Sequence, residues 1–193
     1  AMFDFYQVDP QVDWHHDGRL QFIHGLRNFA QDQVLTNHQT CLSVRSAIAR
    51  AGHHALAQYR VGDEAAGLYW SGHGLHILQD SYSPAHVVRD GAYGERVQEF
   101  CTYSVQLPGI CFHTKLDARD RIWRGDRLDC ALNPGARSWD CLTESAQNAA
   151  DASFEFLAAI QRSRMEGGST DQALEAGLSR FLPCEDIANQ AQL

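Results

Sequence analysis

The chain has 193 residues, of which 44% are hydrophobic and 21% charged. This balance is typical of a globular protein and excludes a disordered chain, and the length fits a single domain over residues 1–193. The formal net charge of -8 lacks the basic excess by which most nucleic-acid-binding proteins neutralise phosphates, so no stable nucleic-acid complex is expected. No stretch approaches the roughly 18 consecutive apolar residues of a transmembrane helix.

Hydrophobic periodicity predicts an all-α fold. In chain order, the expected helices cover residues 20–32, 41–59, 64–79, 142–164 and 170–182. Asp63 is a favourable N-cap for the third helix, and Ser83-Pro84 ends or bends it. Residues around 90–140 are rich in Gly, Pro, Asp, Arg and Cys and are expected to form an irregular insertion, pinned by disulfides, with room for short strands. The apolar positions that set these helical periods are Leu42, Val44, Ile48, Ala55, Leu56, Tyr59, Leu68, Leu75, Leu78, Phe154, Leu157, Ala158, Ile160, Leu174, Leu178 and Phe181.

Six cysteines favour disulfide bonds over metal binding, because their number is even and none forms a Cys-x-x-Cys pair. Disulfides in turn favour a secreted or periplasmic location; the alternative is a cytosolic protein with six buried thiols. Short loop-like stretches separate Cys101 from Cys111 and Cys130 from Cys141, so local pairing within each couple is expected. The remaining cysteines are Cys41 and Cys184.

The ten histidines are the unusual feature of the composition, since histidine is the commonest metal ligand. His76 and Asp80 are four residues apart on an expected helix, which places both side chains on one face, where they can chelate one ion. Pro84 then turns the chain, so that His86 can return to the same place. Zinc accepts this mixture of nitrogen and oxygen ligands. The alternative is that these are hydrogen-bonded histidines without a metal.

The stretch from Leu75 to His86, LHILQDSYSPAH, resembles a Leu-His-x-x-Gln-Asp-x-Tyr-Ser-x-x-His helix end. This pattern is found in the zinc-dependent phospholipase C and single-strand-specific nuclease superfamily, including its heterokaryon-incompatibility relatives. The resemblance implies a helical domain of the zinc phospholipase C type. It also implies that His76 and Asp80 hold a first zinc ion, that Asp80 bridges to another, and that His86 begins the second site.

The resemblance implies further ligands and two or three zinc ions in all. His113 and Asp117, again four residues apart, would complete the second site. His15, in the sequence WHHDG, would join the first, with His16 and His24 as rivals. An upstream carboxylate would act as ligand or general base, and the sequence does not choose among Asp4, Asp9 and Asp13.

The resemblance therefore implies a zinc-dependent phosphodiester hydrolase, phospholipase C-like, with Asp80 as its catalytic residue and phospholipid head groups as its substrate at a membrane surface. A single-strand nuclease is the first alternative, disfavoured by the acidic charge and by the lack of a basic, aromatic track. A non-catalytic secreted binding or toxin-accessory domain on the same scaffold is the second. Tyr69, Trp70 and Tyr82 would line a lipid-contacting mouth or belong to the core.

Overall fold

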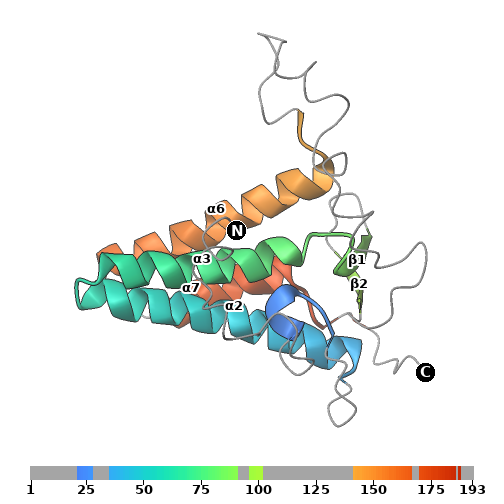
Figure 1. The fold of residues 1–193 in the computed structure, drawn as a ribbon, viewed down its shortest axis with the longest axis horizontal. Helices are drawn as coiled ribbons and strands as arrows, with labels where there is room; N and C mark the ends of the chain where they lie inside the picture. Colours follow the sequence, from blue (N-terminus) through green and yellow to red (C-terminus); the bar gives the residue numbers. More distant parts are fainter. Residues whose placement is uncertain are drawn as a thin grey trace, which may run out of the picture.

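A computed structural model describes residues 21–27, 35–90, 96–101, 141–166, 170–185 and 187. Its elements in chain order are η2 (Gln21–His24), α2 (Asn37–Arg60), α3 (Glu64–Asp80), β1 (Val87–Asp90), β2 (Arg96–Phe100), α6 (Glu144–Glu166) and α7 (Thr170–Phe181). The helices lie alongside one another, and the β1–β2 hairpin sits at one end of them (Figure 1). Within the described residues, no helix is long and apolar enough to cross a membrane.

Helices α2 and α3 form a hairpin whose ends are set by local capping. Thr36 begins α2 with a capping box, accepting a hydrogen bond from the backbone N–H of Gln39 while the Gln39 side chain accepts one from the backbone N–H of Thr36. Gly62 adopts φ +81° after α2, a conformation that only glycine adopts without strain. Asp63 then caps α3 through the backbone N–H of Ala66, at 3.0 Å, as the sequence predicted.

Glycines on α3 let its neighbours pack closely against it. A Cβ atom on Gly67 would lie 2.3 Å from the Tyr59 ring of α2, and one on Gly74 would lie 2.6 Å from the Phe156 ring of α6. Real Cβ atoms essentially never approach so closely, so a side chain at either position would have to displace the facing ring or shift α3. The path of α3 between α2 and α6 therefore depends on these two positions.

The described core confirms much of the predicted helical periodicity. Among the predicted positions, Val44, Ile48, Ala55, Leu56, Leu78, Ile160, Leu174 and Leu178 are buried. Four are exposed: Leu42 by 37%, Leu68 by 63%, Phe154 by 71% and Leu157 by 41%. For α6 the prediction is confirmed at Ile160 but wrong at Phe154 and Leu157, because the buried face follows Ala152, Phe156, Ala159 and Ile160.

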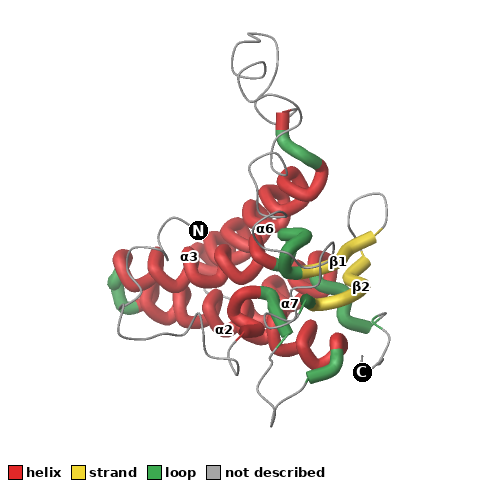
Figure 2. The backbone as a smooth tube through the Cα atoms, turned by 45° about the vertical axis from the view of Figure 1, so that its right-hand side comes forward, coloured by secondary structure: helices red, strands yellow, loops and turns green. Residues whose placement is uncertain are grey.

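The expectation of an all-α fold holds only in its coarser form, a mostly helical fold. Strands β1 and β2 pair antiparallel, with Val87 opposite Phe100 and a register shift between Val88 and Arg89 (Figure 2). The helix expected over 20–32 is described only at 21–27, and there the structure has the short 3₁₀ helix η2, which ends at His24 and is followed by Gly25 with φ +62°. Residues 28–34 and 102–140, which include most of the expected irregular insertion, lie outside the described residues.

A disulfide joins Cys41, in the first turns of α2, to Cys184, just after α7. Both cysteines are fully buried, and they are 143 residues apart in the sequence. Cys101 and Cys141 are also disulfide-bonded, but Cys111 and Cys130 lie outside the described residues, so the expected local pairs are not tested. Disulfide bonds form and persist in oxidising compartments, which agrees with the cysteine count.

Replacing Cys41 and Cys184 together with alanine should lower the free energy of unfolding by about 2–5 kcal/mol, because a cross-link over so long a stretch removes much of the entropy of the unfolded chain. Chemical denaturation followed by circular dichroism measures this loss. Both cysteines lie outside the side-chain cluster described below, so metal binding at a temperature where the variant is folded should be retained. An unchanged unfolding midpoint would contradict this role for the disulfide.

Candidate metal centre

The last two turns of α3 bring His76 and Asp80 together on one face, as the sequence predicted. The Nε2 atom of His76 lies 3.0 Å from Oδ2 of Asp80. Both residues are partly buried, with side-chain exposures of 15% and 22%. Their relative position follows from the helix alone, because residues four apart in an α-helix lie one above the other.

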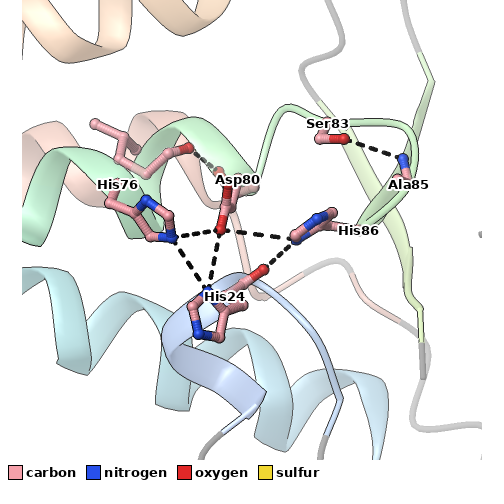
Figure 3. A network of polar contacts seen from close by, with 8 residues as sticks. His24, His76, Asp80, Ser83, Ala85 and His86 are labelled. Atoms are coloured by element: carbon pink, nitrogen blue, oxygen red, sulfur yellow. Dashed lines mark hydrogen bonds and ion pairs between the residues drawn. The ribbon is translucent and has the colours of Figure 1, made fainter. Parts of the chain in front are cut away.

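A second segment, η2, contributes His24 to the same place (Figure 3). Its Nδ1 atom lies 3.1 Å from Nε2 of His76 and 3.5 Å from Oδ2 of Asp80. The His24 and His76 rings meet edge to face, with centroids 5.3 Å apart. We refer to His24, His76, Asp80 and the nearby His86 as the His/Asp cluster.

His86 follows the turn after α3 and approaches the cluster from the opposite side. Its Nδ1 atom is 3.9 Å from Oδ2 of Asp80 and forms a hydrogen bond with the backbone carbonyl of His24. Because a carbonyl can only accept, Nδ1 of His86 carries the proton of this bond. In the neutral ring that leaves Nε2 as the nitrogen with a lone pair, which is how histidines that bind metals are commonly oriented.

A chain of backbone hydrogen bonds ties the two histidine segments to the end of β2. The N–H of Cys101 donates to the carbonyl of His86 at 2.8 Å, and the carbonyl of Cys101 accepts from the N–H of Arg27 at 2.8 Å. Just before it, the N–H of Phe100 donates to the buried side chain of Asn37 at 2.9 Å, at the start of α2. The hairpin therefore fixes the position of His24 relative to His86.

Gly25 lets η2 come close to the end of α3. It has φ +62°, and a Cβ atom there would lie 3.2 Å from the backbone N of Ser81 and 3.3 Å from the carbonyl carbon of Asp80. Both the backbone conformation and the small space favour glycine. The close approach places His24, the preceding residue, beside the Asp80 carboxylate.

Arg89 on β1 holds the peptide that follows Asp80. Its guanidinium donates to the carbonyl of Ser81 at 2.8 Å and to the carbonyl of Phe181 at 3.1 Å, and it lies 4.1 Å from the centre of the Tyr82 ring. Burial lowers the pKa of Arg89 to about 10, so the side chain remains a cation at neutral pH. Tyr82 is buried beneath it and therefore belongs to the core.

Asp80 is ionised although its side chain is partly buried. Burial by itself raises the pKa of this carboxyl group, but hydrogen bonds from His24 and His76, together with the charges of His86 and His76, outweigh that effect. They hold the pKa of Asp80 well below its usual range. The cluster thus presents a carboxylate surrounded by imidazole nitrogens, which is a good set of ligands for a divalent cation.

The geometry of the cluster fits a metal ion. One ligand atom each from His24, His76 and Asp80 lie within 4.8 Å of one another, so this group can hold one ion. Donor atoms about 2.0–2.2 Å from one tetrahedral zinc ion lie roughly 3.3–3.6 Å apart. The three distances here are 3.0, 3.1 and 3.5 Å, close to those values without any rearrangement. Three protein ligands with a fourth position open are typical of catalytic rather than structural zinc sites.

The structure brings together three of the residues chosen from the sequence, His76, Asp80 and His86, and adds His24. From the sequence, His24 was only a rival of His15, because His24 has no motif spacing and meets His76 across 52 residues of sequence. The other candidates, His15, His16, His113, Asp117, Asp4, Asp9 and Asp13, lie outside the described residues. His73 is not part of the cluster and packs edge to face against Trp70.

No protein-family model matches the sequence, and comparisons with curated proteins and with solved structures find no match either. The assignment of this centre therefore depends on the geometry of the described residues.

Replacing His24 with alanine should weaken zinc binding at this centre by at least about tenfold, because it removes one of three ligands. Titration with a competing zinc indicator measures the change. His54→Ala is the matched control, since His54 is exposed and stacks on Trp70 instead of joining the cluster. Equal zinc affinity in the two variants would contradict a ligand role for His24.

Gly25→Ala should weaken metal binding, whereas Gly62→Ala should not. Both residues have positive φ, so each substitution should cost about 1–2 kcal/mol of stability from backbone strain. Only Gly25 presses on the end of α3, while a Cβ atom on Gly62 would meet no described atom within 4 Å. Thermal unfolding and zinc titration of both variants separate the two effects. A similar loss of affinity in both would show that the close approach of Gly25 does not matter.

Proposed function

We propose that this protein is a metal-dependent phosphodiester hydrolase that uses zinc, with phospholipid head groups as its substrate. The observation that carries the proposal is the convergence of His24, His76 and the ionised Asp80 from two segments. The similarity of residues 75–86 to the zinc phospholipase C motif supports the choice of metal and reaction. Disulfide bonds support action in a secreted or periplasmic location.

In this proposal His24, His76 and Asp80 hold the first ion. Bound zinc would act as a Lewis acid toward the phosphate oxygens. It would also lower the pKa of a water bound to it to about 7. His86, with its Nδ1 fixed by the carbonyl of His24, offers Nε2 to a second ion. The resemblance adds His113 and Asp117 to that second site and His15 to the first, for two or three ions in total.

The protein's own contribution is to orient these ligands and to leave one side open. Arg89 and Gly25 hold the backbone at Ser81, just after Asp80. His76 and His24 contact the Asp80 carboxylate itself. The side chain of Asp80 is 22% exposed, compared with 10% for His24 and 7% for His86. In this proposal substrate approaches from the side of the Asp80 carboxylate, which is the most exposed member of the cluster, His76 being 15% exposed.

Elemental analysis of the purified protein, followed by hydrolysis assays, tests the proposal. We expect at least one zinc per chain and turnover of bis-p-nitrophenyl phosphate, with phosphatidylcholine vesicles preferred over single-stranded DNA. Preference for single-stranded DNA would instead identify a nuclease. Zinc binding without hydrolysis of any of the three substrates would favour a non-catalytic binding domain, and absence of zinc after supplementation would remove the basis of the proposal.

Asp80→Asn should lower turnover of bis-p-nitrophenyl phosphate by at least about 100-fold and lower zinc content, because the amide carries no charge to neutralise the ion. Asp63→Asn is the matched control. Asp63 caps the opposite end of α3, and asparagine caps helices as well as aspartate does, so stability and turnover should persist. Normal turnover in Asp80→Asn would sink the assignment of this carboxylate.

A further inference from the structure

A groove of about 290 Å³ lies between α6 and α7, and none of the His/Asp cluster residues lines it. Its floor is apolar, formed by the buried side chains of Phe156, Leu174 and Leu178 and the half-buried Phe181. The volume is at the small end of the range for pockets that bind organic ligands. Its lining suits an alkyl chain better than a polar molecule.

Gly177 leaves this groove open at the middle of α7. Glycine is unfavourable inside a helix, so a helical glycine usually has a packing reason, as Gly67 and Gly74 have here. Gly177 lines the groove, and a Cβ atom on it would meet no described atom within 4 Å. Gly177 therefore contributes no side chain to the groove, and among the described residues nothing occupies the space beside it, which leaves room for a ligand.

The rim of the groove is cationic. Arg162 and Arg180 both line it and are both exposed, against a single carboxylate, Glu155. Within the described residues neither arginine forms an ion pair. Glu155 lies seven residues before Arg162, about 10 Å away along α6, so the end of the groove at Arg162 is the one free of this negative charge.

We propose that this groove binds a medium-chain fatty acid. The guanidinium of Arg162 would pair with the carboxylate, which matches the planar fork of arginine. The alkyl chain would run past Gly177 over the floor formed by Phe156 and Leu178. The span of about 10 Å from Arg162 to Glu155 suits a chain of roughly eight to ten carbons. This site is independent of the His/Asp cluster and of the proposed hydrolase activity.

Isothermal titration of the intact, disulfide-bonded protein with decanoate tests the proposal. We expect saturable binding at one site, with acetate failing for lack of a chain and octanol binding at least tenfold more weakly for lack of a charge. Gly177→Leu should weaken decanoate binding at least tenfold by filling the groove, with the helical circular dichroism signal unchanged. Gly177→Ala, which adds one methyl group, should retain binding.

Arg162→Gln should weaken decanoate binding at least tenfold and leave octanol binding unchanged. Its control is Arg164→Gln, on the same helix, because Arg164 is paired with Glu64 and does not line the groove. This pair also carries the test if Gly177→Leu does not fold. No saturable binding of decanoate, equal binding by Gly177→Leu, or equal binding by Arg162→Gln would each overturn the proposal.

Discussion

The contacts around the end of α3 depend on one unfavourable feature. An ionised carboxylate lies at the carboxyl end of this helix. Asp80 is the last residue of α3, where the helix dipole is negative and a negative side chain is destabilised. Burial adds to that cost. Imidazole nitrogens from His24, His76 and His86 lie within 3.9 Å of one carboxylate oxygen and offset it. A bound cation would offset it more fully, which is why the cluster makes sense as a metal site.

The surrounding elements can be understood as supports for that placement. The guanidinium cation of Arg89 lies at the same end of α3, where the helix dipole stabilises a positive charge. Its hydrogen bonds also connect the end of α3 to the end of α7. Cys101 links the backbone of His86 to that of Arg27, and therefore links the turn after α3 to the segment that carries His24. The groove between α6 and α7 shares with these contacts only Phe181, which lines it and whose carbonyl accepts from Arg89. The two candidate sites therefore occupy separate parts of one mostly helical fold.

The sequence predicted the features that depend on residues close together in the chain. It did not predict contacts between residues that are distant in the sequence. The expected helices at 64–79 and 170–182 agree closely with α3 and α7, because Asp63 and the apolar period mark them directly. The His76/Asp80 pair was likewise evident, since its geometry belongs to one helix. The position of His24 was not evident from the sequence. It depends on the positive φ of Gly25 and on a contact with His86, and the spacing of residues along the chain predicts neither. For the same reason the Cys41–Cys184 pair was not anticipated.

The connectivity of the cluster also orders the events of folding. α2 and α3 are adjacent in sequence and joined by a tight turn, so their contacts are local and form with little loss of chain entropy. His76 and Asp80 belong to that hairpin. His24 reaches it only when η2 docks, and it lies outside the loop closed by Cys41 and Cys184, so no covalent link within the described residues holds it there. We therefore expect the two-ligand half-site to form before the complete one, so that assembly of the centre would report the docking of η2.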